Sequence, residues 1–285
     1  MSWLAIARKD FRDARRAKIL WGATGIFLFF YAVLLLTSSQ GGQPADEAAV
    51  DAIGGLIFAG AFLLPLVIIS MGYLAIAGER ESGSIKYLLG LPNSRREVLI
   101  GKFVGRSALA LTAVGISLVV GAGMLLFQFG TVPVEYLSYS ALTCLFAVVF
   151  IAIAVGLSAL ADTRGKAMAG TIGTYVLFSF IWVVPGINPN DSVAFVVEDL
   201  LGMDATPELY QFVQNLSPVF AYGNAVDAIV FGPPEGGSSG TNHLDPAAAD
   251  TPLYLSDQFL VLLLVGWVVV PLAIGYLRFR SAELG

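Results

Sequence analysis

The feature that most constrains this chain is a series of six long apolar segments without a single charged residue. They cover 19–37, 53–78, 107–129, 137–160, 168–185 and 259–277. Each approaches or exceeds the ~20 residues that a helix needs to cross ~30 Å of hydrocarbon. Only 13% of the residues are charged, against about 25% in a typical soluble domain. The sequence therefore predicts an all-α polytopic membrane protein with six transmembrane helices, built as one transmembrane domain over residues 1–285.

All sixteen lysines and arginines fall on one side of this six-span arrangement. Six precede the first span, six lie between 79 and 106, two lie between the fourth and fifth spans, and two follow the last span. Loops rich in lysine and arginine stay in the cytoplasm, whereas the rule says little about acidic residues. We therefore expect a multi-pass plasma-membrane protein whose termini and 79–106 loop are cytoplasmic.

The acidic residues are skewed to the other side. Asp46, Glu47, Asp51 and Glu135 are outside in this topology, with ten more between Asp191 and Asp257. A surface with only negative charge repels itself in low salt and is screened in high salt. The pattern therefore suggests a halophilic source.

Residues 1–18 predict an amphipathic helix that lies in the membrane interface. At 100° per residue one side carries Trp3, Leu4, Ala7, Phe11 and Ala14, and the other side carries Arg8, Lys9, Arg12, Asp13 and Arg16. Such a helix suits the headgroup layer. A cleaved signal peptide is the alternative, but its apolar region, 19–37, would exceed the usual ~7–15 residues.

The loop 79–106 predicts a short helix, a sharp turn and a second helix that continues into the membrane. Ser84 is placed to cap a helix over Ser84–Leu89, and Gly90 and Pro92 are placed to end it. Ser94-Arg95-Arg96-Glu97 then has the pattern of a capping box. Ile85, Leu88 and Leu89 share one face of the short helix. We expect the leucines to be uncovered by the spans and to contact something outside the membrane, or, alternatively, to anchor the helix among lipid headgroups.

The same run, ERESGSIKYLLGLPNSRREVLIGK, resembles the first cytoplasmic loop of ABC-2 type transporter permeases. The likeness extends to the subgroup that contains the permease of the nitrous-oxide-reductase maturation system. In that family the loop is the coupling element that touches the ATPase subunit. The resemblance implies ATPase-coupling roles for Glu79, Arg80, Glu81, Gly83, Ser84, Ile85, Leu88, Leu89, Pro92, Arg95 and Arg96.

The segment 186–258 is the one large piece expected outside the membrane. We predict helices over Ser192–Leu201 and Pro207–Val230 and a loop over Phe231–Pro252, in which His243 is solvated. The stretch NLSPVFAY, 215–222, resembles a Pro-and-Tyr signature that precedes the last span in the same family. The resemblance implies that Pro218 and Tyr222 belong to an outer gate in the outer leaflet.

The residues that are absent exclude several mechanisms. The six segments contain no Asp, Glu, Lys, Arg or His, which ion-coupled carriers usually place within the membrane. There is no phosphate-binding loop, no base near a nucleophile, and no set of metal ligands. We therefore expect no catalytic residue, no metal, no cofactor and no nucleic-acid partner.

These observations and the resemblance predict the permease subunit of an ATP-driven ABC-2 type transporter, an exporter. Its expected partners are a separate ABC ATPase subunit, a second permease copy or a homologue, and the lipid bilayer. The alternative is a membrane scaffold or signal-transmitting subunit that uses the same fold without net transport.

Overall fold

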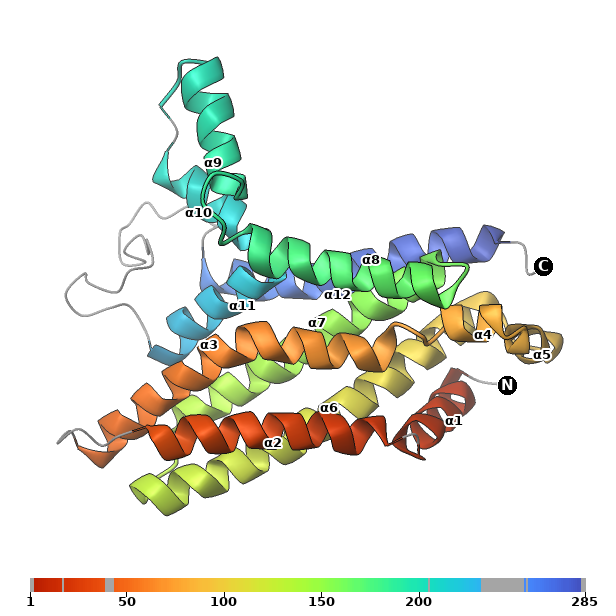
Figure 1. Cartoon of the computed structure of the whole chain (residues 1–285), viewed down its shortest axis with the longest axis horizontal. Helices are drawn as coiled ribbons and strands as arrows, with labels where there is room; N and C mark the ends of the chain where they lie inside the picture. Colours follow the sequence, from red (N-terminus) through yellow and green to blue (C-terminus); the bar gives the residue numbers. More distant parts are fainter. Residues whose placement is uncertain are drawn as a thin grey trace.

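The computed structural model describes residues 3–16, 18–38, 44–204, 206–231, 254 and 256–282. Every regular element within these residues is helical, as the sequence predicts. The long helices run side by side in one bundle, with shorter helices at its two ends (Figure 1). In chain order the elements are α1 (Trp3–Arg16), α2 (Ile19–Thr37), α3 (Ala45–Gly72), α4 (Ala77–Glu81), α5 (Ser84–Gly90), α6 (Arg95–Phe129), α7 (Glu135–Leu160), α8 (Arg164–Val176), α9 (Pro189–Ala194), α10 (Pro207–Asn215), α11 (Pro218–Val226) and α12 (Asp257–Ser281), with three π-helical continuations, η1 (Leu177–Ile181), η2 (Phe195–Leu200) and η3 (Asp227–Phe231).

Five helical stretches in the described ranges are long and apolar enough to cross a membrane. They are Ile19–Thr37, Gly60–Glu81, Arg95–Phe129, Glu135–Leu160 and Gln258–Ser281. Each overlaps one of the predicted spans. The remaining predicted span, 168–185, falls on α8 and η1, which are not among the five. The count of six spans therefore stays a prediction.

Helix α7 forms the centre of the bundle. It packs against α12, α6, α3, α8 and α11, and its Phe146 and Phe150 are fully buried. Gly156 brings α7 directly against α12, because a Cβ atom at this position would collide with the carbonyl oxygen of Pro271. A larger residue would therefore force the two helices apart.

The lysines and arginines gather at one end of the bundle, here called the basic end. It comprises α1, α4, α5, the first turns of α6, the beginning of α8 and the end of α12, and Figure 1 shows these elements together. The acidic end lies opposite and contains the start of α3, the loop between α6 and α7, and the α9–α10 region (Figure 1). The charge asymmetry of the sequence is thus a spatial asymmetry of the fold.

Helix α1 packs across α6 through a face that differs from the predicted apolar one. Its buried residues are Ile6, Ala7, Asp10 and Ala14, whereas Trp3 and Leu4 are 42% and 41% exposed. The close approach depends on Gly101 and Gly105 of α6: a Cβ at Gly105 would lie 2.9 Å from the Ala7 carbonyl oxygen. The two glycines, one helical turn apart, thus let α1 and α6 approach closely.

The segment predicted as one helix over Pro207–Val230 is instead two. α10 ends at Asn215 and α11 begins at Pro218, because proline lacks the N–H that a continuous helix would need. Ser217 caps the new helix by accepting from the Val219 N–H at 3.2 Å. The helix expected over Ser192–Leu201 is present as α9 and η2. The loop 232–252 and its His243 lie outside the described residues.

Candidate functional site

At the basic end the chain leaves α3 through a break in the helix. α3 ends at Gly72, and residues 73–76 form turns before α4. Backbone groups freed at such a break need partners where water is scarce. Arg106 of α6 donates to the Met71 carbonyl at 2.9 Å, and Ser158 of α7 accepts from the N–H groups of Ile76 and Ala77, both at 3.0 Å. The break is therefore held by side chains from two other helices.

A buried cluster of four charges joins α1, α4 and α6. The Lys102 ammonium contacts Asp10 at 2.8 Å and also contacts Glu79. Arg106 Nε lies 2.8 Å from the other oxygen of Asp10. The side chains of Asp10 and Lys102 are only 4% and 7% exposed. Buried charges are tolerated when they are paired, and this cluster has two acids for two bases.

Asp10 and Lys102 were not predicted as functional residues. They lie 92 positions apart in the sequence, so no local pattern joins them. One signal was present: Asp10 shares the face of Ile6 and Ala14, four residues to either side, and that face is the buried one.

On its other side α4 is tied to the loop between α7 and α8. The Arg80 guanidinium donates to Asp162 at 2.7 Å and to the Ala161 carbonyl at 2.9 Å. The Glu81 carboxylate accepts from the Arg164 N–H at 2.6 Å. The Arg80 guanidinium also holds the pKa of Asp162 below its ordinary value. α4 is thus linked to α6 on one side and to the beginning of α8 on the other.

Helix α5 starts differently from the prediction. Ser84 does not cap it: the preceding residue is Gly83 with φ of 73°, and no side chain accepts from the first turn. Glycine adopts this left-handed conformation without steric cost, so the chain turns there without needing a serine cap. The helix ends at Gly90 as predicted, and the Asn93 amide donates to the Leu88 carbonyl at 3.0 Å.

Leu88 and Leu89 are less exposed than predicted. Ile85 is 1% exposed within the buried core, and both leucines pack against that core as partly buried residues. The chain itself covers part of this face, and a role of the leucines in ATPase coupling stays a prediction. The opposite side of α5 presents Tyr87, whose side chain is 84% exposed, and Leu91 beyond the helix is 42% exposed.

The second helix of the loop begins as predicted. The Glu97 carboxylate accepts from the Ser94 N–H at 2.8 Å, and the Ser94 hydroxyl accepts from the Glu97 N–H at 3.2 Å. Arg95 turns inward and donates to the carbonyls of Phe279 and Ala282 at the end of α12, at 2.5 and 2.8 Å. The capping box is confirmed, and Arg95 is committed to a contact within the chain.

The structure thus divides the residues that the resemblance singled out. Those that are buried or partly buried against the chain are Glu79, Arg80, Gly83, Ile85, Leu88, Leu89 and Arg95. Those that are exposed at the surface are Glu81, Ser84, Pro92 and Arg96. Tyr87 and Lys86, which the sequence analysis did not select, join the exposed group.

Pro218 and Tyr222, the residues expected at an outer gate, lie on α11, which packs among α12, α7 and α3. Tyr222 is fully buried. Its hydroxyl is 2.9 Å from the Thr143 hydroxyl, and its ring stacks on Phe146 with centroids 4.1 Å apart. Pro218 is the first residue of α11 and is also buried. α11 is therefore an integral layer of the bundle.

A second buried contact between hydroxyl groups involves Tyr139 of α7, four residues before Thr143. The hydroxyls of Tyr31 and Tyr139 are 2.7 Å apart and join α2 to α7. Thr143, one turn along from Tyr139, donates to the Tyr139 carbonyl at 2.8 Å. These contacts, here called the hydroxyl chain (Tyr31, Tyr139, Thr143 and Tyr222), connect α2, α7 and α11 without formal charge. Neither Tyr31 nor Tyr139 was predicted as a contact between helices, because a tyrosine in an apolar helix is usually a packing residue.

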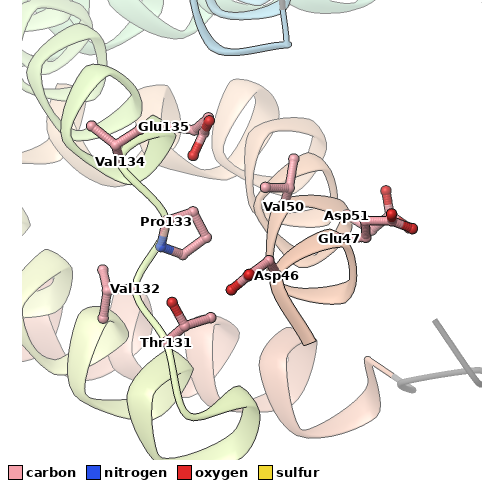
Figure 2. Close-up of a pocket in the computed structure, with 9 residues that line it drawn as sticks. All are labelled: Asp46, Glu47, Val50, Asp51, Thr131, Val132, Pro133, Val134 and Glu135. Carbon is pink, nitrogen blue, oxygen red and sulfur yellow. The ribbon is translucent and has the colours of Figure 1, made fainter. Parts of the chain in front are cut away.

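The acidic end contains an open hollow of about 570 Å³ between the start of α3 and the loop before α7. Its acidic lining residues are Asp46, Glu47, Asp51 and Glu135. Figure 2 shows that they do not converge: Asp46 is turned toward the loop, whereas Glu47 and Asp51 leave the other side of the helix. In the described part of the chain no group of His, Cys, Asp or Glu could hold a metal ion. The basic end, with its buried charge cluster and the exposed side of α5, therefore holds the best candidate site.

Comparisons with known proteins identify the family. The family model described as "ABC-2 family transporter protein" matches residues 4–284. A probable ABC transporter permease protein NosY of Stutzerimonas stutzeri is 29% identical over 288 residues, covering 96% of this chain and 96% of that protein. The protein of the same name from Pseudomonas aeruginosa (strain PAO1) is 25% identical, covering 96% of this chain and 97% of its own length.

The family match spans nearly the whole chain, and the fold is a helical bundle with several helices able to cross a membrane. This chain therefore belongs to the ABC-2 family of transporter proteins, as a multi-pass membrane subunit of an ABC transporter.

Proposed function

We propose that this chain is the permease of an ATP-driven exporter and that a separate ATPase subunit docks on the exposed side of α5. The observation that carries the proposal is Tyr87, an aromatic side chain 84% exposed on a short helix at the basic end. Large exposed aromatics are costly in water and are typical anchors of protein interfaces. Export, and pairing with a second permease copy or a homologue, are part of the proposal.

The contacts around α4 support a route from that docking surface to the membrane helices. α5 follows α4 after a turn of two residues. α4 in turn is paired to α6 through Glu79 and Lys102, and to the loop before α8 through Arg80 and Asp162. The Glu81 carboxylate also accepts from the Arg164 N–H at the start of α8. A displacement of α5 by closure of the ATPases would therefore be passed to α6 and α8 together. The turns at 73–76 separate α4 from α3, so α4 and α6 would move together between two states that nucleotide can bias.

The proposal also places the basic end in the cytoplasm and the protein in the plasma membrane, because the sixteen basic residues gather there. Labelling tests this in a Cys144→Ala background, which removes the single native cysteine. A cysteine at Val134, 76% exposed at the acidic end, should react with an impermeant thiol reagent on intact cells. A cysteine at Ser82 should react only after lysis. Reaction of both from outside would refute this orientation.

Co-purification with the tagged ATPase tests the docking surface. Tyr87→Ala removes the exposed ring and leaves Ile85, Leu88 and Leu89 in their packing positions. If the ring is an interface anchor, its loss should weaken binding by about 2 kcal/mol, or about 30-fold. The variant should insert normally, because the ring makes little contact with the rest of the chain.

Two control variants sharpen the result. Val134→Ala removes a similarly exposed side chain at the acidic end and should retain the ATPase. Leu88→Asp with Leu89→Asp should lower the stability of the permease itself, since both leucines pack on its core. A Tyr87→Ala protein that retains the ATPase at wild-type stoichiometry would show that this side of α5 is not the docking surface.

A further inference from the structure

Helix α1 carries a set of cations that the proposed coupling does not use. They are Arg8, Lys9, Arg12, Arg15 and Arg16, and all five are exposed. Within the described ranges none of them forms an ion pair with an acidic residue. A row of unpaired cations at one place is an electrostatic footprint that attracts an anionic partner.

Three of these arginines form one face of the helix, together with an apolar residue. Arg8, Arg12 and Arg15 are spaced i, i+4 and i+7, so they lie along one side. Leu4, at the border between this side and the predicted apolar side, lies one turn before Arg8. Leu4 is 41% exposed. This set, here called the arginine face (Leu4, Arg8, Arg12 and Arg15), is on the opposite side of α1 from Ile6, Asp10 and Ala14, which are buried against α6.

Helix α1 cannot rotate about its own axis, so the direction in which the arginine face points is fixed. Asp10 is held by Lys102 at 2.8 Å and by Arg106 at 2.8 Å. The glycines at 101 and 105 also seat α1 directly on α6. Rolling the helix would expose a carboxylate whose charge is matched only in its buried position. The orientation of the arginines is therefore fixed by the fold before any ligand binds.

The position of α1 favours lipid as the occupant. α1 passes into α2 through Lys18, which has φ of 60°, so the chain turns sharply and at once enters an apolar helix. Figure 1 shows α1 inclined to α2 at the basic end. Arg15 lies four residues, about one helical turn, before the apolar helix begins at Ile19, and Arg12 and Arg8 follow along the inclined α1. Near the end of a membrane-crossing helix, arginine side chains reach headgroups while an apolar neighbour enters the acyl boundary.

We propose that the arginine face of α1 is a binding site for anionic lipid headgroups in the leaflet at the basic end. A guanidinium matches the geometry of phosphate oxygens and can bind them through two parallel hydrogen bonds. Because Asp10 and Glu79 share Lys102, a lipid held at this face is linked through α6 to the loop that carries α5. The site needs no ATPase, so its failure would leave the proposed docking of α5 intact.

Native mass spectrometry of the purified full-length chain tests the site. The protein is presented with equal amounts of phosphatidylglycerol and phosphatidylcholine, and the wild type should retain phosphatidylglycerol in preference. Each cation near an anionic surface contributes about a fivefold factor. Arg8→Gln with Arg15→Gln should therefore lower the preference by about 25-fold, and Arg8→Lys with Arg15→Lys should restore most of it.

Arg278→Gln with Arg280→Gln is the matched control, since it removes the same charge from exposed positions at the basic end and should keep the preference. Equal losses in the two glutamine variants would mean that only net charge matters, and would overturn the proposal. So would a wild-type preference in Arg8→Gln with Arg15→Gln. If that variant instead lost the tagged ATPase and kept its lipid preference, the arginine face would be a protein-docking surface and the lipid site would be refuted.

Discussion

The basic end of the bundle and the hydroxyl chain hold their helices together by different chemistry. At the basic end, formal charges on Asp10, Glu79, Lys102 and Arg106 meet in a largely buried cluster. In the hydroxyl chain, neutral groups of Tyr31, Tyr139, Thr143 and Tyr222 join α2, α7 and α11 among apolar side chains. Both regions connect helices that are far apart in the sequence, but they would resist displacement to very different degrees.

The difference follows from what remains when one partner is removed. A buried charge without its partner keeps its full desolvation penalty, so the loss is several kcal/mol. A neutral hydroxyl contributes about 1 kcal/mol net, and its partner can often find another acceptor. We therefore infer that the charge cluster ties α1, α4 and α6 together more strongly than the hydroxyl chain ties α2, α7 and α11.

The largest expected effect is at Lys102. Lys102→Met keeps the length of the side chain but leaves Asp10 and Glu79 without their shared cation. We expect a loss of about 3–5 kcal/mol in the free energy of unfolding. Thermal unfolding in detergent can be followed through a maleimide dye that reacts with Cys144, the single cysteine, which is half-buried in α7.

Lys86→Met is the control for Lys102→Met, because Lys86 is exposed on α5 and its loss should change stability by less than ~0.5 kcal/mol. If both methionine variants unfolded alike, the charge cluster would not be the strong junction described here, and the contrast between the two regions would disappear.

Much of the local structure around this cluster could be predicted from sequence, and the cluster itself could not. The capping box at Ser94 and the end of α5 at Gly90 depend on residues within a few positions of each other, so their patterns are visible in the sequence. The pairing of Asp10 with Lys102 depends on how α1 crosses α6 and has no local pattern.

Leu88 and Leu89 also show where prediction from sequence ends. Periodicity correctly placed them on one face with Ile85, but it could not say whether the chain or a partner covers that face. The exposed Tyr87 was overlooked because a single aromatic next to an apolar run carries no periodic signal.

An intermediate effect is expected at the α2–α7 contact. Tyr31→Phe removes the hydroxyl that lies 2.7 Å from the Tyr139 hydroxyl and leaves both rings in place. Because Tyr139 is fully buried, we expect a loss of about 1–3 kcal/mol, measured by the same Cys144 assay. A loss as large as that of Lys102→Met would show that neutral and charged junctions here are equally strong.

A smaller effect on stability is expected at Tyr222. Tyr222→Phe keeps the ring stacked on Phe146, and Thr143 retains its bond to the Tyr139 carbonyl. We expect a loss of about 0.5–1.5 kcal/mol. If this contact is a latch of the outer gate, the variant should also raise ATPase activity of the assembled transporter in the absence of cargo. Unchanged basal activity would mean that the contact is only structural.

The smallest effect is expected at the exposed edge of the basic end, where Arg80 pairs with Asp162. The Asp162 side chain is 49% exposed, so solvent screens the pair and its contribution should be well under ~1 kcal/mol. The pKa of Asp162 is lowered by Arg80, so the stabilisation is present above the ordinary aspartate pKa of about 3.9. It is lost as the pH falls through the lower pKa of the folded state. Wild type should therefore exceed Asp162→Asn in Tm by at most about 1–2 °C at pH ~6, and the two should converge as the pH falls below ~3.9.

Asp13→Asn, at an exposed position without an ion pair in the described ranges, should show no such convergence. If the Tm difference between wild type and Asp162→Asn instead grew as the pH fell, the Arg80–Asp162 pair would not be the source of the stabilisation.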